Sequence, residues 1–273
     1  MEMRFTKMHG LGNDFIVIDS RKRDLRNLPA VVKRLSDRRF GVGFDQALVL
    51  KNSRKADFRM DVYNSDGSRV EMCGNGIRCL ARYIWDRGLK KREQLRIETL
   101  AGIIKPGRAG KNLVAVDMGY PVFEGKLIPV KRGGSIADYP LKVSGRVFKI
   151  SCVGMGNPHC VIFVKDVDGF PVERYGEEIE KHGFFPKKTN VEFVQVLDPG
   201  RLKVRAWERG CGETLACGTG ACASAVISNL KGFTGKRVKV ILKGGSLKIE
   251  LAKDNRVGMT GPAEEVFEGV VEI

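Results

Sequence analysis

The sequence predicts an α/β protein of the α+β class with two pseudo-symmetric domains, each a mixed, barrel-like β-sheet curled around one central helix. The first observation behind this prediction is an internal repeat: CGNG at residues 73–76 and CGTG at residues 217–220 lie 217 − 73 = 144 residues apart. The same offset joins Asn13 to Asn157, each of which follows a glycine. The second observation is that each copy combines one helical pattern with several short strand patterns. Matched glycines, cysteines and asparagines in one register indicate a duplicated domain, because this spacing is far longer than any solenoid repeat.

The repeat also predicts where the domains divide. A chain of 273 residues can form two domains of ordinary size. The segment 118–130 is rich in proline and glycine and is the expected hinge. We expect the first domain to span residues 1–120, completed by residues 262–273, and the second to span residues 121–261, with the active site in the cleft between them.

Two short amphipathic helices are expected at matched positions. Asn27 is expected to cap a helix that opens near Pro29 and ends before Gly41, because proline favours the first turn and glycine follows helix ends. In the second copy, Pro171 opens and Gly183 closes a similar segment. The repeat therefore includes secondary structure as well as polar residues.

A longer helix is expected after each of the two repeated cysteines. After Cys73 the apolar residues share one helical face and Gly88 ends the pattern; they are Ile77, Leu80, Ala81, Ile84 and Trp85. After Cys217 the stretch ACASAVISNL is small or apolar nearly all round and is closed by Gly232. A helix of that composition is expected to lie buried at the centre of its domain.

Short strand patterns surround both helices. In the first copy they are RFTKMH and FIVID on either side of the turn GLGND, and ADFRMDVYN before the turn SDGS. In the second copy they are FVQVL, LKVRAWE, RVKVIL, SLKIEL and RVGMTG. Many short strands with one buried helix predict a sheet that wraps around that helix.

Composition and charge indicate the expected cellular compartment and exclude some classes of partner. The chain is 42% hydrophobic with 33 glycines, which is typical of a globular protein. No apolar run approaches the roughly 18 residues that span a bilayer, and the first residues lack a signal-peptide core, so we expect a cytoplasmic protein with reduced cysteines and no membrane partner. The net charge is 48 − 32 = +16, but the basic residues are dispersed among acids and no nucleic-acid-binding signature is present. We therefore interpret the charge as a solvated, salt-bridged surface and expect no nucleic-acid partner. The sequence does not give the oligomeric state, and a homodimer is kept as an option.

The two repeated cysteines suit acid–base chemistry on an anionic substrate. Cys73 and Cys217 each stand where a loop enters a helix, and the glycines that follow let the first-turn N–H groups approach a ligand closely. A helix N-terminus binds carboxylates and stabilises a thiolate. Two such sites on opposite faces of one carbon acid would remove and donate an α-proton while N–H groups stabilise the developing charge. Inversion of an amino acid is therefore the predicted reaction.

Other roles for the cysteines are less favoured. Cys79, Cys152, Cys160 and Cys222 are interpreted as buried structural residues and Cys211 as a loop thiol. No C-x-x-C pair is present and the three histidines lack ligand spacing, so neither a metal site nor a redox dithiol is expected. Neither Gly-x-Gly completes a dinucleotide or P-loop motif.

Four segments resemble the signature motifs of the diaminopimelate epimerase family: KMHGLGNDF, NSDGSRVEMCGNGIRC, GNPHCVIF and ERGCGETLACGTGACA. The similarity runs from Phe5 to the terminal GPAEEVFEG. The resemblance implies pyridoxal-phosphate-independent interconversion of LL- and meso-diaminopimelate, with no cofactor and no metal, by two curled-sheet domains.

The resemblance also assigns roles to residues. It implies that Cys73 and Cys217 are the acid and base and that His159 and Glu208 tune their protonation. It implies that the following residues bind the substrate: Asn13, Gln46, Asn64, Gly74, Asn75, Asn157, Asn190, Glu208, Arg209, Gly218 and Thr219.

Four residues depart from the family pattern: Phe44, Arg69, Val70 and Lys243. None is a proposed catalytic residue, although Phe44 lies close to Gln46 and leaves the fine substrate preference open. A related racemase acting on proline or hydroxyproline is the alternative; Arg209 with Asn64 and Asn190 favours a substrate with a second amino-acid head group. A phenazine-type isomerase would lack the cysteine pair.

Overall fold

The computed structural model describes residues 2–23, 25–71 and 73–273. Met72 of the motif around Cys73 is outside these ranges. The chain divides into two compact units: unit 1 is residues 1–116 with 260–273, and unit 2 is residues 117–259. Each is a sheet with helices, so the α+β fold class is confirmed.

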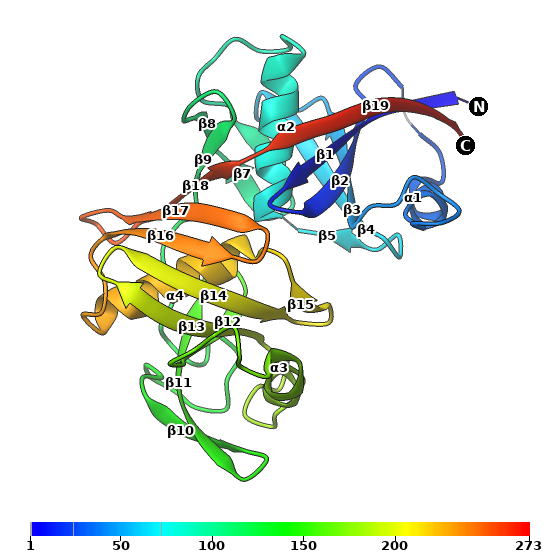
Figure 1. The fold of residues 1–273 in the computed structure, drawn as a ribbon. Coiled ribbons are helices and arrows are strands. Elements are labelled where there is room, and N and C mark those ends of the chain that lie inside the picture. Colours follow the sequence, from blue (N-terminus) through cyan, green and yellow to red (C-terminus); the bar gives the residue numbers. More distant parts are fainter. Residues whose placement is uncertain (1, 24, 72) are drawn as a thin grey trace. The chain divides into compact units, whose positions relative to one another are not determined.

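Unit 1 is built on a twisted sheet of short strands with the order β19-β1-β2-β3-β4-β6-β7, in which β5 pairs with β4 (Figure 1). The first and last strands lie side by side in this sheet, because β1 pairs with β19 from Glu2–Glu272 to His9–Glu264. The hairpin β8–β9, which precedes the passage into unit 2, is not a member of this sheet but of the second, 11-stranded sheet. The strands are β1 (Glu2–Gly10), β2 (Asn13–Asp19), β3 (Gln46–Lys51), β4 (Phe58–Asn64), β5 (Arg69–Val70), β6 (Ile97–Thr99), β7 (Gly102–Ile104), β8 (Gly107–Arg108), β9 (Leu113–Asp117) and β19 (Glu264–Glu272).

Two helices cover the two faces of this sheet. Helix α2 (Gly74–Asp86) packs on β1, β2, β3 and β19, and its expected apolar face from Ile77 to Trp85 is buried. Helix α1 (Leu28–Leu35) packs on the opposite face with the alternate strand residues Ile16, Ile18 and Val49. Because successive strand residues point to opposite faces, the central residues of β2 and β3 contact both layers and are buried, whereas the end residues of these strands are more exposed.

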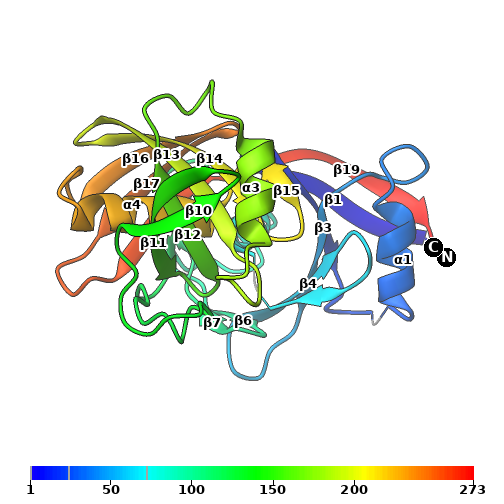
Figure 2. The same cartoon turned by 90° about the horizontal axis from the view of Figure 1, so that it is seen from below.

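Unit 2 repeats this plan with the sheet order β10-β11-β12-β13-β14-β16-β17-β18, in which β15 pairs with β14. Helix α4 (Gly218–Leu230) contacts β11, β12, β13, β14, β16 and β17, so the sheet curls around it (Figure 2). Helix α3 (Val172–Glu180) packs on β10, β13, β14 and β15. The strands are β10 (Tyr139–Val143), β11 (Arg146–Gly154), β12 (Pro158–Phe163), β13 (Asn190–Asp198), β14 (Arg201–Glu208), β15 (Gly212–Thr214), β16 (Arg237–Leu242), β17 (Gly245–Leu251) and β18 (Val257–Pro262).

The internal duplication is confirmed by the element bounds and the strand registers. Helices α2 and α4 begin 218 − 74 = 144 and end 230 − 86 = 144 residues apart. The parallel pairing of β2 with β3 aligns Phe15 with Gln46, and that of β12 with β13 aligns His159 with Asn190, again 144 residues later. Side chains at matched positions therefore point to the same layer of each unit.

The loops of the matched hairpins β1–β2 in unit 1 and β11–β12 in unit 2 differ in length by one residue. In unit 1, Gly10 pairs with Asn13 across a two-residue turn in which Leu11 and Gly12 have φ of 58° and 83°. In unit 2, Gly154 pairs with Pro158, so the loop has one residue more and Asn157 lies in it. Asn13 is consequently the first residue of a strand, whereas Asn157 precedes one.

The prediction that Asn27 caps helix α1 is wrong. Asn27 occupies the N-cap position, but its backbone is left-handed (φ 53°, ψ 36°) and its side chain makes no cap hydrogen bond. A side-chain cap requires an extended backbone at that residue to reach the first-turn N–H groups. Within the described ranges, no helix combines the length and apolar character needed to cross a membrane.

Candidate functional site

Cys73 is the N-cap of helix α2. Its backbone is extended, and its Sγ accepts a hydrogen bond from the N–H of Gly76 at 3.3 Å. A Cβ at Gly76 would lie 2.8 Å from Leu48 Cδ2 and 3.5 Å from the sulfur. Glycine at this position therefore lets the first turn close on the sulfur, and the helix N-terminus favours negative charge there.

The amides of Asn13 and Asn75 lie beside Cys73. Asn75 Nδ2 donates to Asn13 Oδ1 at 3.1 Å, and the thiol of Cys73 lies 3.9 Å from the same oxygen. Arg78, whose side chain is fully buried, donates to Asn75 Oδ1 at 2.9 Å and to the carbonyl of Gly74 at 3.1 Å. Arg78 thereby fixes both Asn75 and the backbone of the first turn.

An ionic cluster holds Asn13 from its other end. Asn13 Nδ2 donates to Asp45 Oδ2 at 2.8 Å, and Arg38 joins Asp45 to Asp14 at 2.7 and 2.8 Å. Lys7 donates to Asp14 at 2.5 Å. Burial raises the pKa of Asp14, but the hydrogen bonds from Arg38 and Lys7 outweigh it and lower that pKa to about 2.

Gln46 and Asn64 form a second polar pair in unit 1. They are opposite each other on β3 and β4, and Gln46 Nε2 donates to Asn64 Oδ1 at 2.8 Å. The amide oxygen of Gln46, Oε1, is buried and has no hydrogen-bond partner among the described residues. An unpaired buried acceptor is costly and suits a ligand that donates a hydrogen bond.

Cys217 is the matching N-cap of helix α4. Its Sγ accepts from the N–H of Gly220 at 3.3 Å and lies 3.5 Å from Thr219 Oγ1. A Cβ at Gly220 would lie 2.6 Å from Glu192 Oε1 and 3.2 Å from the sulfur. The cap geometry of unit 1 is therefore repeated with different neighbours.

Burial and two carboxylates set the protonation of Cys217. Burial raises the pKa of this thiol well above its ordinary value, and the charges of Glu208 and Glu192 add to that shift, while hydrogen bonds from Thr219 and Gly220 oppose it. Burial also raises the pKa of Glu208, against hydrogen bonds with Thr214, at 2.6 Å, and Cys217. The acid form of the thiol is thus favoured in unit 2.

His159 lies fully buried between two oxygen atoms. Its Nδ1 is 2.7 Å from Glu192 Oε1, and its Nε2 is 2.8 Å from Asn157 Oδ1. The charge of His159 acts to lower the pKa of Glu208. His159, Asn157, Glu208 and Cys217 are therefore brought together in unit 2.

Asn190 and Arg209 make contacts that position backbone. Asn190 is buried; its Nδ2 donates to the carbonyl of Pro158 at 2.7 Å, and its Oδ1 accepts from the N–H of Arg209 at 2.9 Å. The exposed Arg209 guanidinium donates to the carbonyl of Lys187 at 3.3 Å. Asn190 thus joins the first residue of β12 to the loop after β14, and Arg209 joins that loop to the segment before β13.

Sequence analysis missed three groups that support the site. Asp45 and Arg38 hold Asn13, Arg78 holds Asn75, and Glu192 holds His159. Of these residues, only Glu192 could have been noticed from the sequence, because it is the one charged residue in the segment NVEFVQV.

The remaining cysteines and the departures from the family pattern lie in other surroundings. Phe44 is buried in the cluster between α1 and the sheet, Arg69 bonds Asp61, and Lys243 lies 2.8 Å from Glu213. Cys211 is exposed, whereas four other cysteines are buried: Cys79, Cys152, Cys160 and Cys222. Burial raises the pKa of Cys79 to about 12, which suits an inert core thiol.

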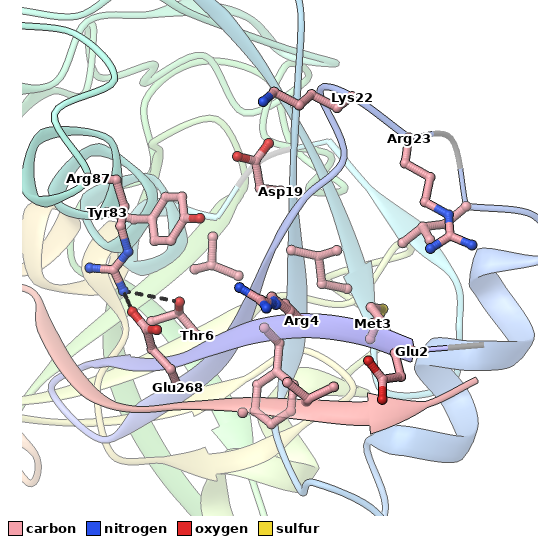
Figure 3. A pocket seen from close by; sticks show the side chains of 16 residues that line it. Glu2, Met3, Arg4, Thr6, Asp19, Lys22, Arg23, Tyr83, Arg87 and Glu268 are labelled. Carbon is pink, nitrogen blue, oxygen red and sulfur yellow. Dashed lines mark hydrogen bonds and ion pairs between the residues drawn. The ribbon is translucent and has the colours of Figure 1, made fainter.

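Unit 1 also contains a cavity of about 520 Å³ that is not lined by the predicted site residues. It is lined by residues of β1, β2, α2 and β19, including Arg4, Asp19 and Tyr83, and by none of the predicted site residues (Figure 3). Arg87 at its wall is already paired with Glu265 and Glu268. Its lining includes neither Cys73 nor Cys217, so it is not the site that the repeat predicts.

Comparisons with known proteins agree with the two-unit architecture. The family model described as diaminopimelate epimerase matches residues 5–124 and 151–266. The diaminopimelate epimerase of Leptospira biflexa serovar Patoc is 49% identical over 280 residues and covers all of both chains. That of Acetivibrio thermocellus is 50% identical over 279 residues and covers 99% of each.

Two solved structures share the fold at low sequence identity. A PhzF-family phenazine biosynthesis protein from Bacillus anthracis has a TM-score of 0.75 at 16% identity, covering all of both chains. A hydroxyproline epimerase from Agrobacterium vitis has a TM-score of 0.71 at 15% identity, covering 99% of this chain and 92% of that one. At these identities the likeness concerns the fold alone.

Proposed function

The chain belongs to the diaminopimelate epimerase family of isomerases, and on that premise we propose that it epimerises LL-2,6-diaminopimelate to the meso form by a two-base reaction of Cys73 and Cys217. The reaction serves lysine biosynthesis and the supply of cell-wall precursor. It uses no cofactor and no metal, because the thiols supply acid and base and the helix N-termini supply anion stabilisation.

One observation carries the proposal. Each unit places a cysteine at a helix N-cap with its sulfur 3.3 Å from the N–H of the third helical residue, at positions 144 residues apart. A helix N-terminus attracts anions and stabilises a thiolate. In the proposed reaction, one thiolate removes the α-proton while the other thiol delivers a proton to the opposite face, and first-turn N–H groups bind the carboxylate as charge develops.

The remaining site residues have supporting roles in this proposal. His159 and Glu208 adjust the protonation of the thiols, since Glu208 hydrogen-bonds Cys217 and its pKa responds to His159. The N–H groups of Gly74, Asn75, Gly218 and Thr219 bind the reacting carboxylate. The second head group of the substrate is bound by polar side chains drawn from Asn13, Gln46, Asn64, Asn157, Asn190, Glu208 and Arg209.

Deuterium incorporation tests the two-base reaction. Purified protein is incubated with LL-diaminopimelate in deuterated water with a chelator and without pyridoxal phosphate. Early product is expected to carry solvent deuterium at the inverted α-carbon while remaining substrate stays nearly unlabelled, because a thiol holds a single proton and internal return restores the original hydrogen. Product that retains its original hydrogen would indicate a single base and contradict the proposal.

Substrate choice tests the identity of the reaction. Proline and trans-4-hydroxyproline have one carboxylate and no distal amine, so they leave the groups assigned to the second head group without partners. No racemisation of either compound is expected under conditions where diaminopimelate turns over. Turnover of either at a comparable rate would instead favour the racemase alternative.

We also propose a cytoplasmic homodimer. The substrate is a metabolite of lysine biosynthesis, which favours the cytoplasm. Strand β19 is the outer strand of its sheet and carries the half-exposed Val266, Phe267 and Val270. An exposed apolar edge strand is a template for pairing with another chain. Light scattering that gives the mass of one chain at micromolar concentration would contradict the dimer.

A further inference from the structure

The buried carboxylate of Glu192 is outside the reaction described above. Its side chain is fully buried, Oε1 lies 2.7 Å from His159 Nδ1, and Oε2 has no hydrogen-bond partner among the described residues. Burying a carboxylate costs free energy, and leaving one of its oxygens unpaired adds to that cost. Because burying Glu192 costs free energy, we looked for a function that this carboxylate could serve.

Unit 1 shows that the fold does not need this polar pair. The positions 144 residues earlier are Phe15 for His159 and Leu48 for Glu192, and both are fully buried. Gly76 faces Leu48 in unit 1 as Gly220 faces Glu192 in unit 2. The same layer of the same fold is therefore filled with apolar side chains where no histidine has to be oriented.

The hydrogen bonds around His159 fix which way its ring faces. An ionised carboxylate only accepts hydrogen bonds, so the Nδ1 that faces Glu192 carries a hydrogen. Nε2 lies 2.8 Å from Asn157 Oδ1, which is also only an acceptor, so Nε2 carries a hydrogen as well and donates it to this oxygen. The acidic groups that face this ring are Glu192 on β13 and Glu208 on β14, and the charges of both raise the pKa of Cys217 at the N-cap of α4.

The orientation of His159 decides which end of Asn157 is available. With Oδ1 bound to the ring, the amide nitrogen is the end that remains to donate to an anionic group. Asn13 in unit 1 is anchored by the opposite end, since its Nδ2 donates to Asp45 and its Oδ1 accepts from Asn75. The two matched asparagines thus present opposite hydrogen-bonding ends.

We propose that Glu192 is a positioning residue that holds His159 with a hydrogen on each ring nitrogen and thereby aims the amide nitrogen of Asn157 at a carboxylate of the second head group of the substrate. The inference rests on the proposed function for its substrate. The orientation of the ring is a property of the protein alone and is measurable without turnover.

Nitrogen NMR of the histidines tests the orientation directly. The chain has only three histidines, so ¹⁵N-histidine labelling of the full-length protein gives resolvable ring signals, and loss of a set in His159→Phe assigns them. We expect wild-type His159 to show a hydrogen on both Nδ1 and Nε2. In Glu192→Leu, which places the unit 1 residue in unit 2, the hydrogen is expected to leave Nδ1 and remain on Nε2, which keeps its bond to Asn157.

Glu180→Gln is the matched control, because Glu180 is another buried carboxylate of unit 2 that bonds Trp207 and Gly210 instead of a histidine. It is expected to leave the His159 signals unchanged. A wild-type Nδ1 without hydrogen, or His159 signals that are the same in Glu192→Leu, would overturn the proposal.

Kinetics supply the second readout. Glu192→Leu is expected to lower kcat/KM for diaminopimelate roughly 10- to 100-fold, the range seen when a partner that orients a functional histidine is removed. The double variant His159→Phe with Glu192→Leu reproduces the unit 1 pair and is expected to melt no lower than Glu192→Leu, because no unpaired polar partner remains. It keeps the test valid if the single variant folds poorly, and a double variant with wild-type kcat/KM would contradict the proposal.

The two proposals fail in different ways. Wild-type protein that shows the Nδ1–H signal but does not epimerise diaminopimelate removes the proposed function and leaves the orientation of His159 intact. Wild-type activity together with an active Glu192→Leu variant removes the positioning role and leaves the proposed function intact.

Discussion

The two units place a cysteine at the same point of the same backbone but surround it differently. Each sulfur lies 3.3 Å from the N–H of the third helical residue. In unit 1 the neighbours are the amides of Asn13 and Asn75, whereas in unit 2 Cys217 lies beside a hydroxyl and is affected by the charges of two carboxylates.

This difference shows which features both copies have kept after the duplication and which features have changed. The cap depends on backbone geometry and on glycines that leave room for the sulfur, so both copies keep it. Protonation depends on burial and on neighbouring charges, which single side-chain changes can alter. One fold can therefore hold two thiols of the same cap geometry in different electrostatic surroundings.

The largest expected effect is the loss of either thiol. Cys73→Ala and Cys217→Ala should each lower kcat for inversion by at least roughly 10²- to 10⁴-fold, because one face of the α-carbon then lacks its proton donor or acceptor. Cys79→Ala and Cys222→Ala remove a buried thiol from the same two helices and are the matched controls. Inversion is measured by product stereochemistry. Near-normal inversion by Cys73→Ala or Cys217→Ala would show that the two thiols do not act as a pair of acid–base groups.

The second-largest expected effect comes from adding a methyl group at Gly76 or Gly220, whose N–H groups bond the two sulfurs. Gly220→Ala places a Cβ 2.6 Å from Glu192 Oε1, and Gly76→Ala places one 2.8 Å from Leu48 Cδ2. Overpacking of either kind costs about 1–3 kcal/mol in the free energy of unfolding. We expect urea titrations to show similar losses in the free energy of unfolding for both variants. The loss of kcat should be larger in Gly220→Ala, because the added methyl group displaces the carboxylate that contacts His159. Equal kcat losses would show that the neighbours of the two caps do not matter.

The ionic cluster of unit 1 predicts acid sensitivity. The pKa of Asp14 falls from 3.8 to about 2 on folding, so its contribution to stability is present above pH 3.8 and lost as the pH drops toward 2. The side chain is only 15% exposed, and the shift corresponds to about 2 kcal/mol. Asp14→Asn should therefore unfold more easily at neutral pH and approach the wild type near pH 2 in a series of denaturant titrations. A constant difference between the two proteins over that range would assign the effect to packing.

The smallest expected effect concerns the hydroxyl of unit 2. The hydrogen bond from Thr219 lowers the pKa of Cys217, so Thr219→Val should raise that pKa further. If the Cys217 thiolate is the base for one direction, the rising limb of the pH–rate profile should move to higher pH by less than about one unit, the equivalent of one hydrogen bond. Thr234→Val, at a buried threonine of unit 2 whose hydroxyl has no hydrogen-bond partner among the described residues, is the control and should leave the profile unchanged.

The sequence by itself determined the duplication, the class of fold and the two cysteine-capped helices. These features are local or periodic: a cysteine before Gly-x-Gly, an apolar helical face, and a repeat of 144 residues are all visible in the order of the residues. Even the burial of helix α4 on nearly all sides followed from its composition.

Only the tertiary structure decided how the polar side chains are held. The bond from Asn13 to Asp45 joins residues 32 positions apart, and that from His159 to Glu192 joins residues 33 positions apart. Asn27 fails as a side-chain cap because its backbone angles, which the residue type does not fix, are left-handed. Hydrogen bonds between distant strands arise from sheet register and packing, so the orientation of an amide or an imidazole ring cannot be read from residue types and spacing alone.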